Sequence, residues 1–154
     1  DIDLLEVLAK NNPKWNIILV GPEDEAFKAS NLHSLDNVLF TGSKNLDTLP
    51  SYLAAFDVAI NPQAINPVTI GNYPRKIDEY LALGIPTVAT KTRAMEIFKN
   101  HVYLAENAAD YQNMIQAALD NNSDALKMSR VEFAKSHTWE NSVDALYENI
   151  LKFL

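Results

Sequence analysis

Apolar residues along this chain fall into two patterns that alternate from one end to the other. Short, mostly apolar runs are typical of strands buried on both faces of a parallel sheet. Longer segments place apolar residues three and four positions apart, which is the period of a helix with one buried face. The patterns predict strands at 15–20, 37–40, 57–62, 87–89 and 101–104, and helices at 3–11, 46–56, 74–83, 92–100, 107–121, 123–135 and from 139 onward.

Strands that alternate with helices predict right-handed β–α–β crossovers, and hence the α/β class with a Rossmann-like, doubly wound parallel sheet. The chain has 154 residues and is 47% apolar, which suits one domain with a sizeable core. It shows no internal repeat and no linker. We therefore predict a single domain over residues 1–154, closed by a terminal helix at 138–154.

The stretch from residue 72 to residue 90 gives the clearest local prediction, a helix that leads into a buried strand. Pro74 suits the first helical position, where its fixed φ is helical and its missing N–H is not needed. Gly84 suits the position just past the helix end, where a left-handed residue closes the last turn. Ile77, Tyr80 and Leu81 share one face, which we predict to be the buried one.

Charged residues at the start of this helix are the first candidates for chemistry. Arg75 and Lys76 lie in its first turn, and two cations beside free helix N–H groups favour an anion site. Lys76 and Glu79 are three residues apart, so they share an exposed face. We interpret Asp78 as a solvated neighbour. Residue types alone leave open a surface helix with scattered charges, or an ion pair between Lys76 and Glu79.

Composition excludes several classes of protein. The formal net charge is −7, which disfavours general nucleic-acid binding because phosphate neutralisation needs clustered Lys and Arg. The chain has no Cys, so a disulfide framework is excluded. No apolar run approaches the length of about 20 residues that spans a membrane. The chain opens inside a helical pattern without Met, as expected for a piece of a longer protein.

No metal and no tightly bound cofactor are expected. The three histidines, at positions 33, 101 and 137, are dispersed without ligand spacing to an acidic partner. Asp1 and Asp3 match an Asp-x-Asp metal motif literally, but they lie at the start of a helix. The chain contains no phosphate-binding P-loop, no nicotinamide-type glycine fingerprint and no Gly-x-Ser-x-Gly nucleophile motif.

The central stretch resembles the donor-site signature of retaining, family-four glycosyltransferases with the GT-B fold. The matching residues are Pro74-x-Lys76-x-x-Glu79-Tyr80-Leu81-Ala82-x-Gly84-x-Pro86-x-Val88-Ala89. Segments resembling the carboxy-terminal domain of these enzymes occur in the same order, beginning at Pro13, Asn37, Leu49 and Trp139. The resemblance covers nearly the whole chain and implies the carboxy-terminal, donor-binding half of such an enzyme.

The resemblance implies a role for individual residues. It implies that Glu79 holds the ribose of a nucleoside diphosphate sugar and that Lys76 lies near its phosphates. Because a fixed cation at a helix N-terminus stabilises the charge that develops on the leaving diphosphate, Lys76 is our candidate for catalysis, and Arg75 either joins it or points to solvent. At the end of the second predicted strand the resemblance implies a base-binding turn of Gly42, Ser43 and Lys44. In the loop before the helix, we expect backbone N–H groups near Gly71 and Asn72 to complete the donor site at the diphosphate, and Tyr73 either to stack on the ligand or to pack against the helix. Gly71 stands where the family's motif has its first Glu, so the sugar is left unassigned.

The resulting function is that of a donor-binding domain in a glycosyltransferase. The full enzyme would move a sugar from a nucleoside diphosphate sugar to an acceptor sugar or lipid-linked glycan, with retention at the anomeric carbon and without metal. The acceptor would be held by an amino-terminal domain absent from this chain. The resemblance implies bacterial polysaccharide or glycolipid synthesis in the cytoplasm, at the inner membrane face. Alternatives are a non-catalytic α/β ligand-binding or regulatory module and a GT-B sugar-nucleotide epimerase.

The resemblance also implies that the first strand of this half, which would precede Asp1, is absent. That strand is normally central in a doubly wound sheet, so exposed strand edges are expected. Three arrangements follow as expectations: a strand supplied by other residues, a rearranged sheet, or self-association of two copies of the chain.

Overall fold

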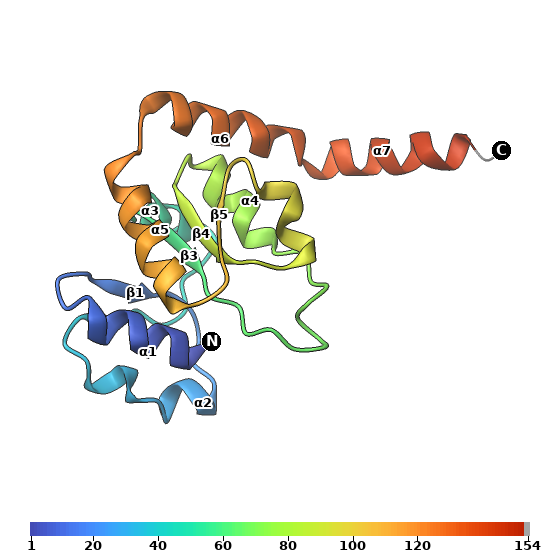
Figure 1. Ribbon diagram of the computed structural model, residues 1–154. Coiled ribbons are helices and arrows are strands. Elements are labelled where there is room, and N and C mark those ends of the chain that lie inside the picture. The colour runs from blue at the N-terminus through green and yellow to red at the C-terminus, as the bar shows by residue number, and fades with distance from the viewer. Residues whose placement is uncertain (153–154) are drawn as a thin grey trace.

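The computed structural model describes residues 1–152; within the last helix, the side chains of residues 139, 142, 145, 146 and 149 are outside that description. All pairings between its strands are parallel (Figure 1). The strands are β1 (Ile17–Leu19), β2 (Val38–Phe40), β3 (Ala59–Asn61), β4 (Thr87–Thr90) and β5 (Tyr103–Ala105). The α-helices are α1 (Ile2–Asn11), α2 (Glu25–Lys28), α3 (Leu49–Ala54), α4 (Arg75–Ala82), α5 (Ala108–Asp120), α6 (Asp124–Ser136) and α7 (Trp139–Leu151), and the 3-10 helices are η1 (Asn31–Ser34) and η2 (Arg93–Phe98).

The strands form two separate sheets rather than the one continuous sheet that we expected. β1 pairs with β2, with Ile17 opposite Val38, and the second sheet has the order β3-β4-β5, with Ala59 opposite Thr87. β1 and β3 are therefore both edge strands. The parallel α/β class is confirmed, and the exposed strand edges expected from the sequence are present.

A cavity of about 740 Å³ separates the edges of β1 and β3. Its lining includes Leu5 and Leu8 of α1 and Ile115 and Leu119 of α5, so apolar side chains from two helices face it. Leu119, which lines this space, is 40% exposed. The amino group of Asp1 donates a hydrogen bond to the carbonyl of Pro62 at 2.8 Å, which places the start of α1 beside the carboxyl end of β3.

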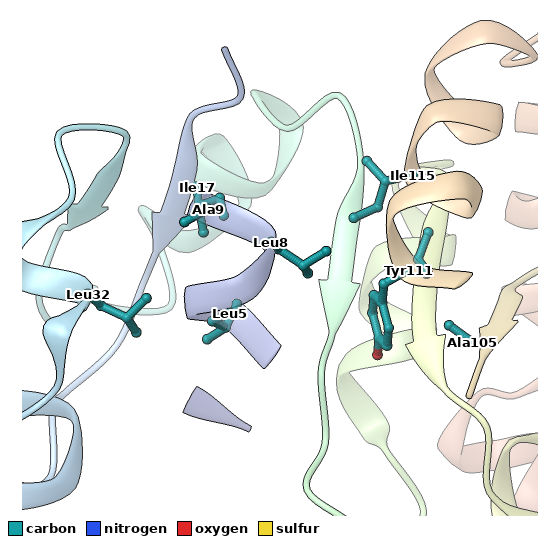
Figure 2. Close-up of a cluster of buried hydrophobic side chains, with 9 residues drawn as sticks. Leu5, Leu8, Ala9, Ile17, Leu32, Ala105, Tyr111 and Ile115 are labelled. Atoms are coloured by element: carbon teal, nitrogen blue, oxygen red, sulfur yellow. The ribbon is translucent and has the colours of Figure 1, made fainter. Parts of the chain in front are cut away.

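Two main hydrophobic clusters hold the helices to the sheets. The first joins α1, β1, β4 and α5 (Figure 2) and includes Leu5, Leu8, Ile17, Val88, Tyr111 and Ile115. The second lies between α4, β4, η2 and α6 and includes Ile77, Leu81, Ala89, Met95, Phe98, Val102 and Ala134. Because α4 is packed in the second cluster, the position of the candidate site on its exposed face is fixed.

The structure confirms most of the prediction for α4 and corrects its first residue. Ile77 and Leu81 are completely buried and Tyr80 is partly buried. Gly84 follows the C-cap with φ +70°, as predicted for a residue that ends a helix. Pro74, predicted as the first helical residue, is instead the N-cap, because its ψ of 83° is not helical.

The remaining predicted elements lie where the pattern placed them, but several are shorter, and α2 and η1 were not among the predicted elements. The helix predicted at 46–56 spans only Leu49–Ala54, and the strand predicted at 57–62 spans Ala59–Asn61. The predicted terminal helix is α7, which extends away from the rest of the domain (Figure 1). Residues 153–154 of that prediction lie outside the described residues.

We expect Gly84→Ala to destabilise the fold, because Gly84 has a positive φ and an added Cβ would lie 2.5 Å from Cγ of Lys127. A left-handed conformation costs an L-residue about 1–2 kcal/mol. Urea unfolding should show a loss of this size or somewhat more. Gly71→Ala is the matched control, since Gly71 has neither a positive φ nor an atom within 4 Å of the added Cβ. Equal effects of the two variants would contradict the prediction.

We also expect the space between β1 and β3 to accept one extended apolar strand. The backbone N–H groups of Ile17 and Ala59 donate hydrogen bonds on the sides of β2 and β4. Because successive residues of a strand alternate in direction, the backbone groups of Ile18 and Ile60 point into the gap. A segment of about six alternating Val and Ile residues, the usual strand length, joined to Asp1 should slow amide exchange at both positions and raise the melting temperature.

The matched control is the same segment with two prolines, which lack the N–H needed for pairing. Unchanged exchange with the apolar segment would contradict the prediction. Light scattering on the unmodified chain tests the alternative. A dimer with slow exchange at Ile18 and Ile60 would show that the edges pair between copies, as the self-association expectation requires.

Candidate functional site

The candidate site lies at the carboxyl end of the cavity between the two sheets. Lys76 and Glu79 both line this cavity, and both are exposed on α4. The last residue of β3 and the residues just after β1 and β3 line the same end of it: Asn61, Gly21, Pro22 and Pro62. Ligands of open parallel α/β folds bind outside the carboxyl ends of the strands. The structure thus brings the two predicted residues together at the expected edge.

Lys76 and Glu79 do not form the ion pair that we considered as the structural alternative. The ion pairs among the described residues involve other side chains. Both head groups therefore remain available to a ligand. Tyr80, which also lines the cavity, has its pKa raised by burial and by the neighbouring Glu79 carboxylate, so its hydroxyl stays protonated at neutral pH.

The amino end of α4 offers fewer free backbone donors than a simple helix start. The N–H of Arg75 donates to the carbonyl of Tyr73 at 3.1 Å, and the N–H of Ile77 donates to the carbonyl of Pro74 at 2.9 Å. No side chain caps this end. Arg75 is exposed in the first turn. Attraction of an anion here therefore depends mainly on the side chains and on the positive end of the helix dipole.

Residues 63–73, which we call the donor loop, are held by hydrogen bonds within the loop. Gln63 Nε2 donates to the carbonyl of Thr69 at 2.6 Å, and the N–H of Asn72 donates to the same oxygen at 3.1 Å. In this conformation the Asn72 N–H is therefore not available to a diphosphate. Gly71 is exposed with open space around it, so its backbone remains accessible.

Tyr73 contacts the protein through its hydroxyl. It donates a hydrogen bond of 2.7 Å to Oδ2 of Asp78, and its ring lies 5.6 Å from that of Phe98. Burial, followed by the bond to Asp78 and its charge, raises the pKa of Tyr73 well above its usual value. The interpretation of Asp78 as a solvated residue was wrong: its side chain is 22% exposed and it holds Tyr73.

Residues of the turn that follows β2 also make their polar contacts within the protein. Gly42 has φ +68° and its carbonyl accepts a hydrogen bond from the N–H of Gly21, which lines the cavity. Lys44 Nζ donates to the carbonyl of Thr41 at 2.7 Å and lies 4.9 Å from the centre of the Tyr52 ring. Ser43 is exposed. Of the three residues predicted to face the base, Gly42 thus contacts a residue that lines the cavity, and Lys44 is held by its own turn.

A buried hydroxyl pair that the sequence did not reveal fixes the strand ends at this edge. The Tyr111 hydroxyl donates to the carbonyl of Asn61 at 2.8 Å and lies 2.9 Å from Oγ1 of Thr90. Burial raises the pKa of Tyr111 well above its usual value. Nothing in the sequence marks the hydroxyl of Tyr111 as a hydrogen-bond donor to β3.

The described residues contain neither a candidate metal site nor a candidate membrane span. Within residues 1–152, no three or more His, Asp or Glu side chains are grouped so that they could hold a metal ion. None of the helices described is long and apolar enough to cross a bilayer.

Comparisons with known proteins identify relatives of the chain. The family described as "Glycosyl transferases group 1" matches residues 3–121. TuaH of Bacillus subtilis (strain 168), which is named as a teichuronic acid biosynthesis glycosyltransferase, is 27% identical over 162 aligned residues. The alignment covers 99% of this chain and 39% of TuaH, so the chain spans about two fifths of that relative's length.

A solved structure shows the same fold. A chain in the crystal structure of the GtfA/B complex superposes with a TM-score of 0.65 at 15% sequence identity. The match covers 98% of this chain and 33% of the other. At this identity the likeness establishes the architecture of the domain, which is the Rossmann-like arrangement predicted from the sequence.

Proposed function

This chain belongs to the glycosyl transferases group 1 family, and we propose that it is the donor-binding domain of a GT-B glycosyltransferase. The longer enzyme would move a sugar from a nucleoside diphosphate sugar to an acceptor sugar or lipid-linked glycan. The observation that carries the proposal is that Lys76 and Glu79 line one cavity at the carboxyl ends of β1 and β3. This pair offers one cation and one carboxylate to the same ligand.

The two side chains suit different parts of a nucleoside diphosphate sugar. Glu79 is an acceptor of hydrogen bonds, which matches the hydroxyls of a ribose. The ammonium group of Lys76 matches the diphosphate, and Arg75 adds a second positive charge in the same turn. Negative charge on the diphosphate grows as the glycosidic bond breaks. A fixed cation therefore stabilises the transition state more than the ground state, which makes Lys76 and Arg75 our candidates for catalytic residues.

The rest of the donor site would come from three further segments. The Gly71 backbone in the donor loop is open toward solvent, and the turn of Gly42 and Ser43 is joined to the cavity rim through Gly21. These segments would contact the sugar phosphate and the base. No metal ligand or cofactor is part of the proposal, because the two cations would supply the charge that a metal would otherwise provide.

The setting of the reaction is proposed from the relatives. The name of TuaH refers to teichuronic acid biosynthesis, which supports polysaccharide synthesis as the process. The acceptor would be bound by polypeptide beyond this chain, as would any contact with a cytoplasmic membrane face. Because the reacting groups must then be held between two parts of the enzyme, the chain alone should bind donor weakly and should not transfer sugar.

Calorimetric titration with UDP, GDP, ADP and their nucleosides tests the proposal. One diphosphate should bind saturably, and Lys76→Ala should weaken it about 10–100-fold, as expected for one charge-assisted hydrogen bond, with little effect on the nucleoside. Glu79→Gln should weaken nucleoside and diphosphate alike. Lys14→Ala is the matched control, because Lys14 lines the same cavity among the residues that precede β1.

Three results of the titration would contradict the proposal. They are equal losses of nucleoside and diphosphate in Lys76→Ala, a loss in Lys14→Ala as large as that in Lys76→Ala, and no binding by either the chain or the longer protein. In the longer protein, acceptor-dependent net release of nucleoside diphosphate would separate a transferase from an epimerase, which returns its nucleotide to the product.

A further inference from the structure

Asp78 lies between two segments that are far apart in the sequence. Its Oδ2 accepts the hydrogen bond from the Tyr73 hydroxyl at 2.7 Å, and its Oδ1 lies 3.3 Å from Nδ1 of His137. Tyr73 is the last residue of the donor loop. His137 is the C-cap of α6 and is separated from the first residue of α7 only by Thr138. One carboxylate in the first turn of α4 therefore touches both the donor loop and the junction between α6 and α7.

The two partners of Asp78, Tyr73 and His137, also pack against the same buried ring, that of Phe98. Phe98 is completely buried, and its ring centre lies 5.6 Å from that of Tyr73 and 5.9 Å from that of His137. Phe133 of α6 packs edge-on against His137 at 4.3 Å. Close-packed interiors transmit displacements because they contain little free space. A shift of His137 therefore changes the packing against which Tyr73 is held.

The facing atoms of Asp78 and His137 are both buried, and neither has a hydrogen-bond partner among the described residues. Buried polar atoms without partners are unfavourable, and 3.3 Å becomes a hydrogen bond after a small rotation of the imidazole when Nδ1 carries a proton. The position of the junction thus decides whether the Oδ1 of Asp78 is satisfied. That in turn changes how the same carboxylate holds Tyr73 through Oδ2.

We propose that Asp78 is a positioning residue that couples the junction of α6 and α7 to the donor loop. The role of the loop rests on the proposed function, but the coupling itself is a property of the ligand-free protein. The coupling runs from α7 to the donor loop. Because α7 extends away from the domain (Figure 1), any contact that turns this helix at Thr138 moves His137 first and the donor loop through Asp78.

Amide exchange in the ligand-free chain tests the coupling. The N–H groups of Ile70 and Asn72 bond to carbonyls within the donor loop, so their exchange reports its opening. Tyr73→Phe should accelerate this exchange about fivefold, as expected for the loss of one net hydrogen bond. His137→Leu should accelerate it to a similar extent, because it removes the imidazole that faces Oδ1 of Asp78. The double variant should be scarcely faster than either single variant, because both changes interrupt the same link.

The matched control is His101→Leu. His101 stacks on the same Phe133 ring at 4.2 Å, but its hydrogen bond is to Ser129 rather than to Asp78. It should leave the exchange of Ile70 and Asn72 unchanged. His137→Gln, which retains a donor for Asp78, should restore most of the protection, and it replaces His137→Leu if that variant does not fold. Melting temperatures verify folding throughout.

Additive effects of Tyr73→Phe and His137→Leu, or no effect of His137→Leu on loop exchange, would overturn the coupling. So would an equal effect of His101→Leu. Titration of the same variants with UDP, GDP and ADP is a second readout, and the diphosphate that binds should lose affinity in parallel with loop protection. Intact coupling without nucleotide binding by either the chain or the longer protein would overturn the proposed function alone, so the two failures are distinguishable.

Discussion

The burial of one face of α4 is the constraint on which the candidate site depends. Ile77 and Leu81 are completely buried, and each such side chain contributes roughly 1.5–3 kcal/mol relative to an exposed one. At the other end of the helix, Arg130 Nε donates to the carbonyl of Gly84 at 3.0 Å, which ties the helix end to α6. With this face fixed, the helical period places Lys76 and Glu79 on an exposed face that lines the cavity.

The second constraint is the separation of the two sheets. Backbone N–H and C=O groups must pair or be hydrated, and the edges of β1 and β3 face each other across an apolar space. The cavity thus has two regions with different chemistry. Its middle, lined by Leu5, Leu8 and Ile115, suits an apolar strand, whereas its carboxyl end, with Lys76 and Glu79, suits an anionic polar ligand. The volume of the cavity alone therefore does not indicate which of the two regions binds the anionic ligand.

The local features of α4 were predictable from the sequence because they depend on neighbours within a few residues. The buried face, the left-handed Gly84 and the shared face of Lys76 and Glu79 are of this kind, and the structure has each of them. The one-residue error at Pro74 is local too: its ψ of 83° is not helical, and the N–H of Arg75 turns back to the carbonyl of Tyr73.

Features that depend on contacts between distant segments could not be predicted in this way. Asp78 looked like one charge among several because its second partner, His137, belongs to another helix end. The hydroxyl of Tyr111 bonds to β3, which no helical pattern reveals. The separation of the strands into two sheets likewise depends on which strands pair with one another. The resemblance to a family indicated an absent strand, and the structure locates the two edges, β1 and β3, that such a strand would face.

The overall charge of the chain sharpens what the site must do. A domain with a formal charge of −7 repels an anionic donor at long range, so attraction has to be local. At physiological salt the Debye length is about 8 Å, which screens distant carboxylates far more than a cation in direct contact. The cations in the first turn of α4, together with the positive end of its dipole, act within that distance. Specific anion binding is therefore compatible with the acidic net charge of the domain when Lys76 contacts the phosphates directly.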